Sequence, residues 1–101
     1  MIDYQTAQAA EDYCFRRSWR LRLRRRDARW LIHVAAAKLA WQAPTDLRYR
    51  QAEWREHLAS HLEEVVRRSY GNPVVVWFLL NVVVPIVVKL VIEWWLNRQE
   101  A

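Results

Sequence analysis

The sequence predicts an all-α protein: a cytoplasmic hairpin of two long amphipathic helices, followed by a C-terminal single-pass transmembrane helix. Three observations predict this fold class. Apolar residues recur with helical spacing over residues 1–43 and again over residues 44–70. An almost entirely apolar run follows at residues 74–92, and it is long enough to cross a bilayer as a helix. The chain has 101 residues, which is room for one small domain and little more.

The first predicted helix covers residues 1–43, which contain no glycine or proline. Successive residues of a helix point about 100° apart, and this spacing gives the segment two apolar stripes on opposite sides. The aromatic stripe consists of Phe15, Trp19, Leu23, Trp30, Val34, Ala37 and Trp41. The aliphatic stripe consists of Cys14, Leu21, Ala28, Ile32, Ala35 and Leu39. A helix inside its own small domain needs only one apolar face. Two stripes therefore predict a helix held between the second helix and another chain.

The aromatic stripe is the better candidate for the contact with the other chain, because Trp and Arg dominate the energetics of protein interfaces. The chain has seven tryptophans, an unusually high number for its length. The predicted partner is a different protein or a second copy of this chain. The candidate partner-binding residues are Phe15, Trp19, Leu23, Trp30 and Trp41. The aliphatic stripe is then expected to pack on the second helix.

Arginine is concentrated in the stretch WRLRLRRRDARW at residues 19–30, where six of twelve residues are Arg. The net charge of the chain is +5, which indicates anionic partners. Three partners remain open: acidic residues of another chain, anionic lipid headgroups and, less favoured, nucleic acid. Trp between Arg suits stacking on bases, but no known nucleic-acid recognition module is present. The candidate contacts are Arg16, Arg17, Arg20, Arg22, Arg24, Arg25, Arg26 and Arg29.

The second predicted helix covers residues 44–70. Pro44 ends the first helix, and Thr45 or Asp46 is expected to cap the next one. Acidic and basic residues nearly balance in this segment, so the cationic character of the chain is concentrated in residues 16–29. The apolar stripe of the second helix consists of Leu47, Trp54, Leu58, Leu62, Val65 and Val66.

The third predicted helix covers residues 73–96 and crosses a membrane, which leaves a short tail at residues 97–101. Sixteen of the nineteen residues in 74–92 are apolar, and a helix of this length spans ~28 Å, close to the thickness of the hydrocarbon core. Trp94 and Trp95 follow the run, where an aromatic belt belongs. The alternative is the central helix of a soluble protein. A domain of this size has little room to bury such a helix on all sides.

The flanks of this helix predict its start and its orientation. Asn72 can cap it, and Pro73 suits its first turn. Under the positive-inside rule, the basic residues near the ends place the N-terminal part in the cytoplasm and the tail outside. Five arginines lie in residues 44–70, the segment just before the helix, and only Arg98 follows it; the five are Arg48, Arg50, Arg55, Arg67 and Arg68.

Four polar or helix-breaking residues recur every four positions along the third helix: Asn81, Pro85, Lys89 and Glu93. They share one side of the helix. Pro85 has no N–H to donate to the carbonyl of Asn81, so a kink is expected. Lys89 and Glu93 can form an ion pair. The four residues predict a polar seam for helix–helix contact within the membrane. In the alternative interpretation, Lys89 and Glu93 reach the interface and Asn81 is merely tolerated.

No reaction chemistry is expected. His57 and His61 have a spacing that can share a metal ion, but surface histidines are the more common case, so no metal and no cofactor is predicted. The single cysteine, Cys14, is expected to be an apolar packing residue. The predicted role is a non-enzymatic membrane anchor or scaffold subunit of a larger assembly. The alternatives are a small membrane-active effector of the lysis or toxin kind, including a phage-encoded one, and a membrane tether for nucleic acid.

Overall fold

The structure, a computed structural model, describes residues 2–100, and all of its regular elements are helical. The predicted all-α class is therefore confirmed. Two short 3-10 segments and one π-helical segment accompany the α-helices. In chain order the elements are α1 (Tyr4–Arg17), the 3-10 segment η1 (Trp19–Arg24), α2 (Arg25–Gln42), the 3-10 segment η2 (Leu47–Tyr49), α3 (Gln51–Ser69), α4 (Pro73–Phe78), the π segment η3 (Leu79–Val83) and α5 (Val84–Glu100).

The single helix expected over residues 1–43 is wrong, because the chain breaks at Ser18. The backbone of Ser18 is extended, and its N–H donates to the carbonyl of Cys14 at 3.0 Å, which closes α1. The chain then enters α2 through η1. A continuous helix of this length would be about 60 Å long and would carry most of its apolar surface away from the rest of a small domain. The break allows α1 and α2 to pack against each other and against α5.

The second helix also begins later than predicted. The turn η2 follows Pro44, and α3 starts at Gln51 rather than at Thr45 or Asp46. The carboxylate of Asp46 instead lies 3.5 Å from the guanidinium of Arg50. The predicted ends of both helices are otherwise correct, because α2 stops before Pro44 and α3 stops before Tyr70.

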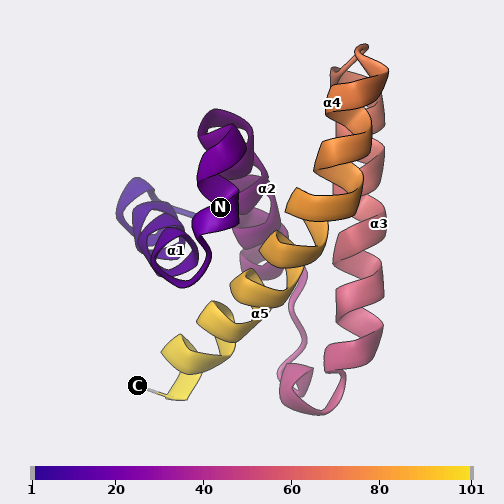
Figure 1. Cartoon of the computed structure of the whole chain (residues 1–101). Coiled ribbons are helices and arrows are strands. Elements are labelled where there is room, and N and C mark those ends of the chain that lie inside the picture. The colour runs from indigo at the N-terminus through magenta and orange to yellow at the C-terminus, as the bar shows by residue number, and fades with distance from the viewer. Residues whose placement is uncertain (1, 101) are drawn as a thin grey trace.

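The core of the molecule is built around α5, which packs against α1, α2 and α3. Figure 1 shows α4 running beside α3 and α5 continuing across the molecule towards α1 and α2. The contacts between α2 and α3 are fewer than those that either helix makes with α5. The expected hairpin is therefore not the main packing unit. The radius of gyration is 12.8 Å, close to the ~13 Å expected for a compact domain of 100 residues.

The helix that contains α4 and α5 begins as the sequence predicts. The side chain of Asn72 accepts hydrogen bonds from the N–H groups of Val74 at 2.9 Å and Val75 at 3.3 Å. Such a cap satisfies N–H groups that have no partner within the helix. Pro73 occupies the first turn, where its missing N–H leaves no hydrogen bond unmade.

The segment η3 lies immediately before Pro85. The N–H of Val84 donates to the carbonyl of Leu79, five residues earlier, which is the π-helical pattern. The side-chain amide of Asn81 donates to the carbonyl of Trp77 at 2.9 Å. Figure 1 shows the helix axis changing direction between α4 and α5. A wider turn before a proline lets the helix continue without the clash that the ring would cause.

In the part of the chain that the structure describes, one helix, Pro73–Arg98, is long and apolar enough to cross a membrane. It has two distinct faces. The exposed face carries Val74, Trp77, Asn81, Pro85 and Lys89. The other face belongs to the core and carries Leu79, Val83, Val84, Val87, Val88, Val91 and Ile92. One side of this helix is thus covered by the chain's own helices.

Hydrogen bonds join the N-terminal helix to the C-terminal part of α5. The hydroxyl of Tyr13 donates to Glu93 at 3.4 Å, and the side-chain amide of Asn97 donates to the Tyr13 oxygen at 3.1 Å. In this arrangement α1 and the end of α5 lie side by side. The structure gives no support to the expected topology, in which these two parts lie on opposite sides of a membrane.

Candidate functional site

The aliphatic stripe predicted for the first segment forms the inner side of α1, η1 and α2. The side chains of Cys14, Leu21, Ala28, Ile32, Ala35 and Leu39 are all fully buried. They pack in one cluster with residues of α3 and α5. This stripe therefore supplies the core contacts that hold the N-terminal half of the chain together.

The aromatic stripe is mostly exposed. Trp19 is 66% exposed, Leu23 58%, Trp30 38% and Trp41 75%. Trp30 also packs on the ring of Tyr70, with a centroid distance of 6.1 Å. We call Trp19, Leu23, Trp30 and Trp41 the aromatic face. Two of these residues lie on η1 and two on α2, and exposed large apolar side chains of this kind are candidates for contact with another chain.

Phe15 is not part of this face. It is only 8% exposed, and the guanidinium of Arg25 lies 5.2 Å from the centre of its ring. The helical projection placed Phe15 in line with Trp19 only because it assumed one continuous helix. The break at Ser18 turns α1 and moves Phe15 into the core. Its predicted role in partner binding is therefore not possible in this fold.

The eight predicted arginine contacts are all exposed. Residues 16–29 contain eight Arg and one Asp, a net charge of +7. The rest of the chain holds eight basic and ten acidic residues, a net charge of −2. The whole positive balance of the protein thus lies on η1 and the adjoining turns of α1 and α2. Such a local field attracts anions.

Only part of this charge is compensated inside the molecule. Arg24 pairs with Asp27 at 2.7 Å, and Arg29 pairs with Glu11 at 2.9 Å. Arg17 lies over the ring of Tyr13 at 4.3 Å, and Arg20 lies 5.9 Å from the ring centre of Trp19. Within residues 2–98, no ion pair is formed by Arg16, Arg22 or Arg26.

A small polar network lies beside Trp30, one residue of the aromatic face. Asp27 is only 9% exposed and accepts hydrogen bonds from Arg24 at 2.8 Å and from the hydroxyl of Tyr70. Burial and this hydrogen bond to a carboxylate raise the pKa of Tyr70 to about 12. Because Tyr70 follows α3, the network attaches the end of α3 to the start of α2. It also places the Tyr70 ring under Trp30.

The four residues of the predicted polar seam lie in two different environments. Asn81, Pro85 and Lys89 lie on the exposed face of the helix, whereas Glu93 is partly buried and accepts the hydrogen bond from Tyr13. No Lys89–Glu93 ion pair occurs among the described side chains. Lys89 instead lines a pocket with Trp19, Arg17 and Arg20. Sequence reasoning did not associate Lys89 with the arginine segment.

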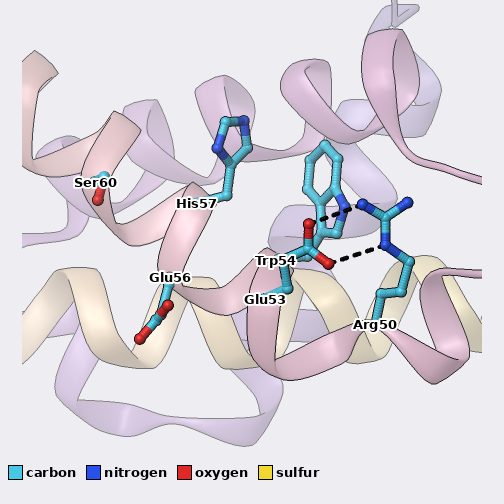
Figure 2. Close-up of a pocket in the computed structure, with 6 residues that line it drawn as sticks. All are labelled: Arg50, Glu53, Trp54, Glu56, His57 and Ser60. Atoms are coloured by element: carbon cyan, nitrogen blue, oxygen red, sulfur yellow. Dashed lines mark hydrogen bonds and ion pairs between the residues drawn. The ribbon is translucent and has the colours of Figure 1, made fainter.

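A shallow pocket on α3, shown in Figure 2, has a volume of about 480 Å³ and is lined by polar residues and Trp54. Arg50 and Glu53 form a two-pronged pair at 3.0 and 2.8 Å, and this hydrogen bonding lowers the pKa of Glu53. In Figure 2, Glu56, His57 and Ser60 point in different directions and do not converge on one position. The pocket therefore does not bring these three side chains together at one point.

In the described part of the chain, no cluster of three potential metal ligands includes His57 or His61. The ring of His57 packs edge-on against Trp54 at 4.9 Å. Burial lowers the pKa of His61. Both histidines therefore have ordinary packing environments on α3.

No protein-family model, curated protein or solved structure matches this chain. The function is therefore inferred from the sequence and the geometry of the molecule.

Proposed function

We propose that this chain is a non-enzymatic, single-pass membrane anchor or scaffold subunit of a larger protein assembly. The observation that carries the proposal is the pairing of two unusual surfaces. One is the aromatic face, and the other is the exposed side of a helix that is long enough to span a bilayer. The first is suited to a partner chain, and the second to lipid or to a neighbouring helix.

A protein partner for the aromatic face is supported by its composition. Exposed Trp surrounded by Arg is typical of interface hot spots. Residues 16–29, with a net charge of +7 by their composition, would attract acidic side chains of the partner and speed its association. Anionic lipid headgroups are an additional contact for the same arginines. Trp30 is the least exposed member of the face, so Trp19 and Trp41 are the better candidates for anchor residues.

For the orientation, we propose that the N-terminal helices are cytoplasmic and that the tail after residue 96 is outside. The excess of arginine before the span supports this orientation. The partly exposed ion pairs and the polar contacts of α1 and α2 cannot enter hydrocarbon without a large desolvation cost. A crossing α5 therefore has to separate from α1, which breaks the contacts of Tyr13 with Glu93 and Asn97.

The aromatic face is tested by replacing Trp19 and Trp41 with Ala. We expect each change to weaken the assembly by about 2 kcal/mol or more if both residues are central anchors. The chain should remain folded, because both side chains are largely exposed. Affinity purification from native membranes in mild detergent measures the partner retained, and circular dichroism measures the fold. The matched control is Tyr49→Ala, since Tyr49 is 86% exposed but lies outside the aromatic face. Equal retention of the partner by all three variants would contradict the proposal.

The separation of α1 from α5 is tested by a cross-link. Cysteines replace Tyr13 and Asn97, and Cys14 is changed to Ala; a short bifunctional thiol reagent then joins the two positions in the compact form. We expect the joined protein to lose its resistance to alkaline carbonate extraction, because its ends can no longer lie on opposite sides of a membrane. The same protein treated with a monofunctional reagent is the control and should remain inserted. Insertion that is unaffected by the cross-link would contradict the crossing of α5.

A membrane-active effector is the second candidate, and one observation favours it. The compact fold covers one side of the apolar helix with α1, α2 and α3. A chain with this arrangement can stay in water until it meets a bilayer. Release of a dye from vesicles after addition of the detergent-free protein would favour the effector. Insertion without leakage, together with co-purification of a partner, would favour the anchor subunit.

A further inference from the structure

A second pocket lies between η1 and α5 and has an unusual lining. Its volume is about 290 Å³, just below the range of pockets that enclose a whole small-molecule ligand. A headgroup-sized ligand fits such a space better. The pocket is lined by Arg17, Ser18, Trp19, Arg20, Ile86, Lys89 and Leu90. These are three cations, one hydroxyl and three apolar side chains, and none of them is acidic.

The three cations have no anionic partner among the described side chains. Arg17 and Arg20 lie over the rings of Tyr13 and Trp19, which leaves their N–H groups available. The nearest acidic residue along α5, Glu93, accepts its hydrogen bond from Tyr13 instead. Like charges that share a site destabilise one another unless an anion lies between them. The lining of the pocket is therefore positively charged, and a bound anion would balance this charge.

The chemistry of the lining identifies the class of anion. The planar guanidinium of Arg forms two parallel hydrogen bonds with a phosphate, and Lys adds a point charge. Ile86 and Leu90 belong to the helix that is long enough to span a membrane, and they form an apolar wall beside the cations. Trp19 combines an apolar ring with a polar N–H, as residues at the membrane–water boundary do. A phosphate ester that carries an apolar chain matches both parts of the lining.

We propose that this pocket binds the phosphate headgroup of an anionic membrane lipid. Arg17, Arg20 and Lys89 hold the phosphate oxygens, and the acyl chains follow Ile86 and Leu90 along α5. The inference rests on the proposed association with a membrane and concerns the compact form, in which η1 lies beside α5; this lipid contact precedes the crossing of the bilayer by α5. It also gives Lys89 a role, since an isolated charge on an apolar helix is unfavourable in lipid. Binding of headgroups at this pocket is distinct from the general attraction of the other arginines to a charged surface.

The test compares Lys89→Gln with the charge-matched control Arg26→Gln by sedimentation with vesicles of phosphatidylcholine, with and without phosphatidylglycerol. Arg26 is exposed, lies outside the pocket and has no ion pair among the described residues. Loss of a general surface charge should weaken binding to the anionic vesicles about fivefold. Loss of a direct charged hydrogen bond should weaken it more than about tenfold. Arg20→Gln should behave like Lys89→Gln.

Each outcome has a defined meaning. Equal losses for Lys89→Gln and Arg26→Gln would overturn the pocket but leave membrane association intact. Failure of the unchanged protein to bind any vesicle would overturn the proposed function itself. Glycerol 3-phosphate, compared with sodium chloride at the same ionic strength, separates the two sources of phosphate. If glycerol 3-phosphate binds the unchanged protein but not Lys89→Gln, and the protein binds no vesicle, the ligand is a soluble phosphate ester. The lipid proposal is then wrong.

Discussion

Replacement of Ile32 with Ala is expected to lower the free energy of unfolding by about 2–5 kcal/mol, through lost burial and the cavity that remains. Ile32 is fully buried in α2, at the centre of the aliphatic stripe. Native domains are stable by only about 5–15 kcal/mol, so this single change removes a large part of the total. Urea unfolding of the compact protein, followed by circular dichroism, measures the loss.

The matched control for Ile32→Ala is Trp41→Ala in the same helix. Trp41 is the larger side chain, but it is 75% exposed, and surface substitutions usually change stability by no more than ~0.5 kcal/mol. Comparing the stability of these two variants thus tests which stripe is buried and which is exposed. If Trp41→Ala unfolds the protein as readily as Ile32→Ala, the assignment of the aromatic face to the surface is wrong.

Asp27→Ala is expected to destabilise the fold by about 1.5–3 kcal/mol, the range for hydrogen bonds to charged groups. The change removes the acceptor for Arg24 and for the hydroxyl of Tyr70. Arg24 can turn to solvent, because its side chain is 42% exposed, but the Tyr70 hydroxyl is partly buried. A double-mutant cycle with Tyr70→Phe isolates this pair. Additive losses in the cycle would show that the Tyr70–Asp27 bond does not stabilise the protein.

The same pair predicts how stability depends on pH. The pKa of Tyr70 is raised to about 12 from its ordinary value of 10, so the folded protein holds the neutral phenol more strongly than the unfolded chain does. The resulting stabilisation is complete below about pH 10 and is lost as the pH rises through 12. In the Tyr70→Phe variant, the loss of stability at alkaline pH should be smaller. The urea midpoint at several pH values between 8 and 12 measures the difference.

The local rules of helix formation predicted much of this fold. Helix periodicity identified the aliphatic stripe as a coherent face, and the structure places all of its members in the core. The cap at Asn72 and the stop before Pro44 follow from the hydrogen-bonding capacity of those residues. These features depend on near neighbours in the chain, which the sequence displays directly.

The break at Ser18 could not be predicted by the same rules. Neither glycine nor proline marks it, and Ser is tolerated within helices. What favours the break is the burial of both α1 and α2 against α5, a helix more than forty residues further along the chain. The misplacement of Phe15 follows from this one error. The pocket around Lys89 was missed for a related reason, because only tertiary packing brings η1 beside α5. An uncompensated lysine within an apolar run was the available signal.

The surroundings of the third helix could be predicted only in part. Hydropathy measures how strongly a segment avoids water, and both lipid and a protein core satisfy that requirement. The sequence therefore indicated a helix of spanning length but could not state which neighbours cover it. In the structure α1, α2 and α3 cover one side, including Val87 and Ile92. The other side, with Val74 and Trp77, remains exposed.

The central position of α5 has a consequence for the order of events during biosynthesis. The helices α1, α2 and α3, which surround α5, leave the ribosome before it. The aliphatic stripe of α1, η1 and α2 therefore lacks part of the surface it packs against while these segments emerge. The Tyr13–Glu93 contact joins residues 80 positions apart, and closing such long loops is slower than forming a local helical hairpin. During that interval the nascent α1 and α2 expose apolar surface on which chaperones can act. Under the proposed function, docking of α5 onto the waiting helices then competes kinetically with its capture by a bilayer.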